Sequence, residues 1–265
     1  MKIFKFRSSV LFVVLATLVL PVFAQKKATP KGVAVDPNVV RGREIMDKAM
    51  AKLSADNRVM QESFSYEEKR ITINYNFRSG KEENRREEIY VIKPINGVPH
   101  QRRFGDLTDN YKPVDDTKEQ GHKIKVDASF ANGFNFRLKE SPSADSPFYV
   151  LEFYEKAGVK PVGRGIIEKN IYKTAMKFKG TVEVWADDFS IKTWYGKLGE
   201  KFSSSIFATA EDGEFTFSLI RLPGNLAFLE KYDLLTKVNL CLLCPMKDIY
   251  RRTIKERKDF QKVAP

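Results

Sequence analysis

The stretch that decides the fold of this chain is Gly180-Thr-Val-Glu-Val-Trp-Ala-Asp-Asp-Phe-Ser-Ile-Lys192, which has the pattern of two β-strands joined by a tight acidic turn. The strand signals run from Thr181 to Trp185 and from Phe189 to Tyr195, with Asp187-Asp188 between them. A parallel connection needs about a dozen residues or more, so a link this short makes the two strands antiparallel. The stretch therefore predicts a β-hairpin.

The same period-two pattern recurs along most of the chain. It covers Ser63 to Phe77, Arg85 to Lys93, Phe134 to Leu138, Phe148 to Phe153, Ile171 to Phe178, Phe215 to Leu219 and Leu234 to Leu240. Asn96-Gly97 and Asp212-Gly213 are turn dipeptides. The 20 Phe, 10 Tyr and 2 Trp suit the pleated surface of a curved sheet. We therefore expect a mainly β protein with few helices, built as a meander of roughly nine to eleven antiparallel strands.

Three further segments complete the pattern. Asp36 and Pro37 are start signals for a helix, whose apolar stripe is formed by Ile45, Met46, Ala49, Met50 and Leu53. Gly105 to Lys123 is polar and predicts a loop or a short helix. Met246 to Val263 fits either a helical face or a polar edge strand.

The start of the chain has the parts of a secretory signal peptide. A basic beginning is followed by the apolar run Val10 to Leu20 and by Val22-Phe23-Ala24, which places small residues where signal peptidase cleaves. The apolar run is short for a stable membrane span. We expect a signal peptide at 1–24 that is cleaved after Ala24, a flexible linker at 25–36 and a single domain at 37–265.

The charge of the chain limits its partners. Lys and Arg number 46 against 34 Asp and Glu, a net charge of +12. For an exported protein this balance favours an anionic membrane surface or an acidic protein surface over nucleic acid, so we expect no nucleic acid as a partner. Simple solubility is the alternative interpretation, because charges of both signs are interspersed.

The chain resembles the LolA/LolB-like superfamily of outer-membrane lipoprotein carriers, and within it the lipoprotein-sorting-protein-like members. The stretches that carry this resemblance are Arg41–Met50, Gly80 with the strand Glu87–Ile92, Phe148–Phe153 and Gly180–Lys192. The resemblance implies an antiparallel half-barrel, a curved meander sheet whose concave face is covered by the N-terminal helix. It also implies a periplasmic location and a hydrophobic cavity for lipoprotein acyl chains or another lipid-like ligand.

The candidates for the lining of that cavity are large rings at strand positions. They are Phe64, Tyr66, Tyr75, Tyr90, Phe136, Tyr149, Phe153, Phe178 and Trp185. For each ring taken alone, an ordinary place in the protein core is the alternative. The helix residues Ile45, Met46, Met50 and Leu53 are the candidates for a lid over the cavity.

The chain offers little sign of catalysis. His100 and His122 have no metal-like spacing with Cys or with each other, and no Gly-x-Ser-x-Gly motif is present. Adjacent carboxylates such as Glu67-Glu68 point to opposite faces of a strand, which argues against an acid/base pair. We therefore expect no catalytic residues, no metal and no cofactor, and the chain is not expected to be an enzyme.

Cys241-Leu-Leu-Cys244-Pro245 is the sharpest local pattern. On one continuous strand the two Cα atoms would lie about 10 Å apart, beyond the roughly 7 Å limit for a disulfide. A bridge between Cys241 and Cys244 therefore requires a turn at Leu242-Leu243. In an oxidising compartment a structural disulfide is the first expectation, with buried free thiols and redox or metal chemistry as alternatives.

These observations favour a periplasmic, non-enzymatic carrier or binding protein for lipoprotein acyl chains or another lipid-like ligand. An envelope regulatory or sensor module that binds a membrane protein is the alternative. A thiol oxidoreductase that uses Cys241 and Cys244 is a lesser one.

Overall fold

The structure is a computed structural model that describes residues 36–106, 110–114, 128–160, 166–205, 208–240 and 248–263. Every described residue belongs to one unit, Val35–Pro265. The expected signal peptide, all of the linker except Asp36, and the Cys241/Cys244 pair lie outside the described residues.

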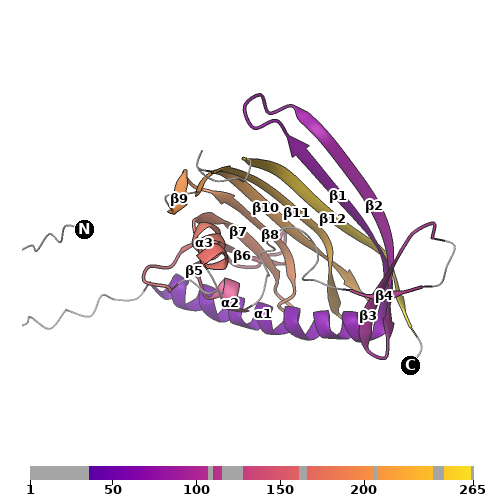
Figure 1. The fold of residues 1–265 in the computed structure, drawn as a ribbon. Coiled ribbons are helices and arrows are strands. Elements are labelled where there is room, and N and C mark those ends of the chain that lie inside the picture. Colours follow the sequence, from indigo (N-terminus) through magenta and orange to yellow (C-terminus); the bar gives the residue numbers. More distant parts are fainter. Residues whose placement is uncertain are drawn as a thin grey trace, which may run out of the picture. The chain divides into compact units, whose positions relative to one another are not determined.

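The described residues form one antiparallel sheet of 12 strands with helices on one face (Figure 1). The strands are β1 (Phe64–Tyr75), β2 (Glu82–Ile95), β3 (Val98–Arg103), β4 (Lys112–Pro113), β5 (Phe134–Glu140), β6 (Phe148–Glu155), β7 (Phe178–Trp185), β8 (Ile191–Leu198), β9 (Phe202–Ser205), β10 (Ala208–Leu222), β11 (Leu226–Leu240) and β12 (Ile249–Lys262). The helices are α1 (Pro37–Ser63), α2 (Ala128–Ala131) and α3 (Ile166–Ala175).

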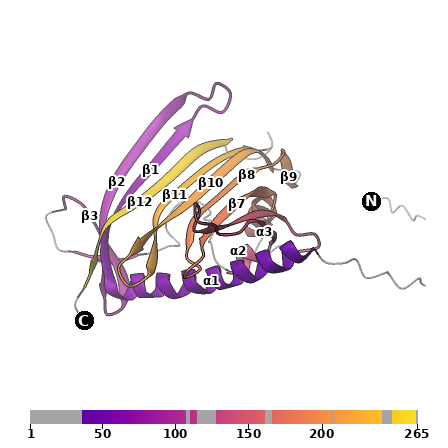
Figure 2. The same cartoon turned by 180° about the vertical axis from the view of Figure 1, so that it is seen from behind.

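The sheet is a meander with one long jump. Its order is β4-β3-β2-β1-β12-β11-β10-β8-β7-β6-β5, and β9 pairs with β10 beside this path. The chain runs from β1 out to the β4 edge, restarts at the opposite edge with β5, and returns until β12 pairs with β1. The sheet curves over α1, as Figures 1 and 2 show from opposite sides. The expected fold, a mainly β curved antiparallel sheet with the N-terminal helix packed on it, is confirmed.

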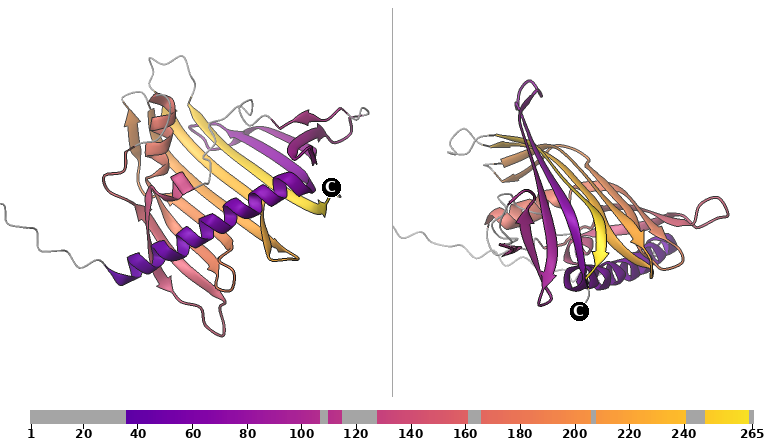
Figure 3. Two further views of the ribbon diagram at one scale, coloured as in Figure 1. Left: turned by 90° about the horizontal axis from the view of Figure 1, so that it is seen from below. Right: turned by 90° about the vertical axis from the view of Figure 1, so that its right-hand side faces the viewer.

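Helix α1 begins where the sequence predicts. Asp36 caps it, because its side chain accepts a hydrogen bond of 2.9 Å from the Asn38 N–H, and Pro37 occupies the first turn. The helix crosses the strands diagonally (Figure 3, left). At the crossing with β5, a Cβ on Gly42 would lie 2.5 Å from the Phe136 carbonyl oxygen, so only glycine permits this approach.

Two local expectations were wrong. The predicted strand Ile171 to Phe178 is mostly helix α3, and β7 begins only at Phe178. The same residues also fit a helical period: Tyr172 and Met176 are four apart, and both pack into the core. Asp212-Gly213 is not a turn but lies inside β10. There a Cβ on Gly213 would meet the Phe178 ring at 2.7 Å, so this glycine serves packing rather than a turn.

The two undecided segments are partly settled. Residues Ile249–Lys262 form strand β12, which is paired on both sides and is therefore neither a helix nor an edge strand. Within Gly105 to Lys123, the described residues contain the short strand β4.

Candidate functional site

The concave face of the sheet, which we define as the face that carries α1, has its side chains aligned in rows. The pairing registers give one row across the sheet as Glu88, Arg70, Lys255, Tyr232, Phe217, Trp194, Val182, Leu151 and Leu138. They give the next row as Arg86, Thr72, Thr253, Leu234, Phe215, Gly196, Gly180, Phe153 and Phe136. Side chains alternate between the faces along each strand, so the members of a row share the concave face.

Both rows change character at β11. From β10 to β5 they hold aromatic and aliphatic residues or glycine, and Phe217, Trp194 and Phe153 are at most 5 % exposed. From β12 to β2 the rows hold charged residues and threonines instead. The concave face therefore consists of an apolar half and a polar half, which meet at Tyr232 and Leu234 of β11.

The apolar half is closed by packing. The ring of Phe130 in α2 contacts the rings of Trp194 and Phe134, at centroid distances of 5.3 and 5.1 Å. Gly180 and Gly196 face each other across β7 and β8, and a Cβ on Gly196 would touch the ring of Phe215 at 2.5 Å. The rings of Phe215 and Phe153 thus fill the space that Gly196 leaves, and this half of the face forms the main core.

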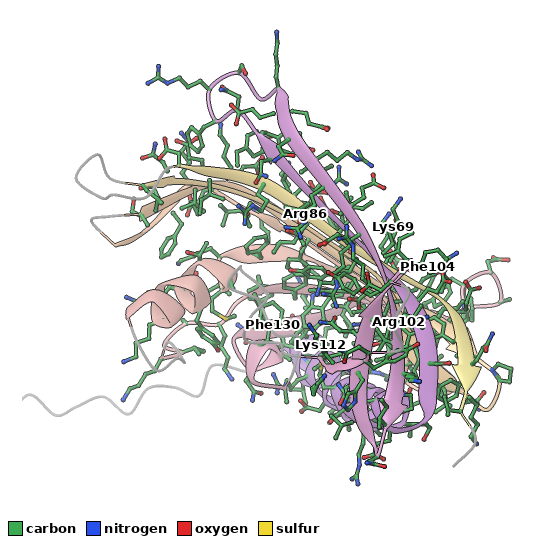
Figure 4. All side chains as sticks on the ribbon, turned by 45° about the vertical axis from the view of Figure 1, so that its right-hand side comes forward. Lys69, Arg86, Arg102, Phe104, Lys112 and Phe130 are labelled. Carbon is green, nitrogen blue, oxygen red and sulfur yellow. The ribbon has the colours of Figure 1, made fainter. Side chains whose placement is uncertain are left out.

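The polar half is partly open to solvent. We call the following twelve concave positions of β2, β1, β12 and β11 the polar array: Glu88, Arg86, Asn84, Arg70, Thr72, Asn74, Lys255, Thr253, Arg251, Tyr232, Leu234 and Thr236. All of these positions on β1, β12 and β11 are half-buried, whereas Arg86 and Asn84 are exposed. Figure 4 places Arg86 and Lys69 on opposite sides of the β1–β2 ribbon, in agreement with the alternation along the strands.

A buried carboxylate anchors one border of the polar array. Glu68 is 1 % exposed, and its Oε1 accepts a hydrogen bond of 2.6 Å from Arg70 Nε. Its Oε2 accepts one of 2.8 Å from Arg257 Nε. Burial alone would raise the pKa of this carboxyl group, but the charges of Arg257, Lys255 and Arg70 outweigh burial and lower the pKa to about 2. Glu68 is therefore ionised at neutral pH and holds two guanidinium groups in place.

The rings predicted to line a cavity fall into three places. Phe136, Tyr149, Phe153 and Phe178 belong to or pack against the main core, beside the lid candidates Ile45, Met46, Met50 and Leu53. Phe64, Tyr66 and Tyr90 belong to or pack against a smaller cluster at the end of α1, around Met60 and Phe228. Their role in ligand binding stays a prediction, as does the opening of the helix.

Tyr75 and Trp185 lie on the convex face. Tyr75 contacts Tyr250 at a centroid distance of 4.9 Å, and Trp185 contacts Phe148 at 4.3 Å. Val184, the residue before Trp185, is fully buried in the core on the concave side, so Trp185 points the other way.

The sequence pattern did not predict the polar array, although the sequence of β1 contains a signal for it. Its apolar residues are at even positions at first, Phe64 and Tyr66, and at odd positions later, Ile71 and Ile73. This change of phase leaves Arg70, Thr72 and Asn74 on the face that Tyr66 occupies. The period-two pattern alone predicts a strand in this segment, but it does not show that the apolar residues move from one face of the strand to the other.

The described part of the chain has few features of other classes of site. It contains no group of three or more His, Cys, Asp and Glu side chains that could hold a metal ion. Among its helices, none is both long enough and apolar enough to cross a membrane. A cavity of about 320 Å³ near the start of α1 is lined by Val39, Arg43, Phe134 and Lys156, among others.

No family model matches the chain, and no curated protein sequence matches it. Among solved structures, the chain is similar to a DUF1329 family protein from Desulfovibrio piger ATCC 29098, with a TM-score of 0.34 and 11% sequence identity over 83% of this chain and 92% of that chain.

Proposed function

We propose that this protein is a periplasmic, non-enzymatic binding protein for a lipid-like amphiphile, such as a lipoprotein acyl chain or a lipid, and that it holds this ligand on the concave face. The observation that supports the proposal is the change from polar to apolar side chains along two adjacent rows of that face. An amphiphile has the same division, with an apolar body and a polar end.

The place where the two halves meet is the part of this surface best suited to first contact. Tyr232 and Leu234 are half-buried, and both pack against the main core. An acyl chain that lies over these two residues loses contact with water and gains contact with apolar surface. This contributes about 0.8 kcal/mol to the free energy of binding for each CH₂ group buried. Further burial of the chain requires that the cover formed by α1 and α2 moves, which is the lid role expected for α1.

A matched pair of variants tests the proposal. Leu234 and Leu235 are neighbours on β11, both half-buried, and they lie on opposite faces. We expect the delipidated protein to take up a lysophospholipid or a short lipopeptide, as measured by native mass spectrometry. Leu234→Gln should weaken this uptake about tenfold, since one apolar contact of up to about 1.5 kcal/mol is lost. Leu235→Gln should leave it unchanged.

Two results contradict the proposal. One is a wild-type protein that takes up neither amphiphile. The other is an equal loss of uptake in both variants when circular dichroism shows that both are folded. A stable apo protein that retains one inner-membrane protein in a pull-down would favour the regulatory module instead.

A further inference from the structure

We propose that the polar array binds the phosphate group of its ligand, so that the ligand is an anionic amphiphile with a phosphate headgroup. This inference rests on the proposed function for its apolar part. It is carried by the arrangement of hydroxyl and cationic side chains around one cross-strand pair, Thr72 and Thr253.

The threonine pair lies at the centre of the polar array. Thr72 faces Thr253 across β1 and β12, and Arg86 is the partner of Thr72 on the other side. Directly opposed side chains in a sheet are about 5 Å apart, and next-but-one residues on a strand about 7 Å. Arg251 is two residues before Thr253 on β12 and lies on the same face, so its side chain is within reach of an anion bound over the threonine pair. The two hydroxyls and two guanidinium groups form one set of donors.

The array carries more positive than negative charge. Its cations are Arg70, Arg86, Lys255 and Arg251, and its single carboxylate is Glu88. Arg251 donates from Nε to a neutral acceptor, the Asn74 Oδ1, at 2.8 Å. Arg70 is held by Glu68 and its side chain is only 15 % exposed. It therefore contributes to the positive electrostatic potential of the array more than to direct contact with a ligand.

The charged side chains are arranged differently on the convex face of the same strands. Arg252, one residue after Arg251, binds both carboxylate oxygens of Asp233, at 2.9 and 2.7 Å. Lys231 pairs with Glu256 at 3.3 Å, and Lys69 pairs with Glu87 at 2.9 Å. Each of these convex cations thus pairs with an acid. In the concave array Arg86 also pairs with Glu88, at 2.8 Å, but the four cations of the array outnumber its one carboxylate and lie among threonines and asparagines. The excess is a property of this face and not of the strands in general.

A phosphate group matches this set of donors better than a carboxylate does. It offers more acceptor oxygens, arranged tetrahedrally, and guanidinium groups bind phosphate oxygens in pairs. Leu234 lies next to Thr253 in the same row, and Tyr232 lies next to Lys255. A phosphate over the threonines would therefore have its attached chain directed toward the apolar half.

Three probes separate the two parts of the ligand: a short-chain phosphatidic acid, the neutral diacylglycerol with the same chains, and inorganic phosphate. Binding is measured by isothermal titration calorimetry on the full mature protein, below the micelle concentration. The test variant is Arg86→Gln/Arg251→Gln. The control is Arg85→Gln/Arg252→Gln, which removes the same charge from the convex face of the same strands.

We expect wild-type protein to bind the phosphatidic acid at least about tenfold more tightly than the diacylglycerol, because each charged hydrogen bond contributes about a factor of ten. The test variant should lose this preference, and the control should keep it. Equal affinity for both lipids, or a preference that survives in the test variant, overturns the phosphate site while leaving the proposed function intact. Binding of inorganic phosphate alone, lost in the test variant, supports the phosphate site and contradicts the lipid carrier.

Discussion

At the scale of single residues, the ionised side chain of Glu68 on the concave face makes the stability of the fold depend on pH in the acid range. Its pKa of about 2 in the folded protein lies below the ordinary value of 4.5, so the unfolded chain takes up the proton first as the pH falls. The stabilisation is therefore complete above about pH 4.5 and is lost as the pH falls toward 2. Its size is on the order of 3 kcal/mol.

This predicts how Glu68→Gln behaves. At pH 7 the variant should be less stable by about 3 kcal/mol or more, because Arg70 and Arg257 lose their buried partner. The difference from wild type should shrink between pH 5 and pH 2 in urea unfolding curves. Glu67→Gln is the control, since Glu67 pairs with Lys258 on the convex side and its loss should cost less than about 1 kcal/mol. A difference that does not change with pH would contradict the low pKa.

Gly196 carries a second prediction at this scale. A methyl group there would meet Phe215 at 2.5 Å and Phe153 at 2.8 Å, inside a core with fully buried rings. Gly196→Ala should therefore lower the free energy of unfolding by about 1 to 3 kcal/mol. Gly199→Ala is the control, because its methyl group meets only the flexible side chain of Lys179, at 3.0 Å, and should change stability by less than about 0.5 kcal/mol. Equal stability of the two variants in denaturant would show that the rings can move aside.

At the scale of elements, one buried aspartate attaches α1 to the β10–β11 turn. Asp56 is 4 % exposed and accepts hydrogen bonds from Lys52 Nζ at 2.6 Å and from the Ala227 N–H at 3.0 Å. Lys52 also donates to the carbonyl oxygen of Asn225 in that turn. The helix is thus held by polar bonds at the turn as well as by its apolar stripe.

Removing this attachment should be costly. Asp56→Ala should lower stability by about 2 to 3 kcal/mol, since a buried backbone N–H loses its charged acceptor. Hydrogen exchange at Ala227 should become faster in the same variant. Glu62→Ala removes an exposed pair with Arg58 at the same spacing on the same helix, and it should cost less than about 0.5 kcal/mol. Unchanged exchange at Ala227 would show that Asp56 does not hold the turn.

At the scale of the whole molecule, local signals in the sequence predicted most of the strands, helix α1 and the hairpin with a short turn, but not the strand pairs that are distant in the chain. The hairpin around Asp187-Asp188 and the helix start at Asp36 depend on neighbouring residues, and both are present. The pairing of Ile71 with Ile254 joins distant parts of the chain, and no local pattern indicates it. The polar array could not be predicted for the same reason, because it exists only once β1 and β12 lie side by side.

The pairing of β1 with β12 also sets the order in which the domain can form. β2 can join β1 as soon as both have been synthesised, but the other neighbour of β1 lies almost the whole domain further along the chain. Until β12 arrives, the inner edge of β1 presents unpaired backbone groups, the kind of edge that other chains can pair with. Contacts so distant in sequence also slow folding. Strand β12 is therefore the one that joins the two parts of the sheet, and without it β1 and β11 would become two further open edges.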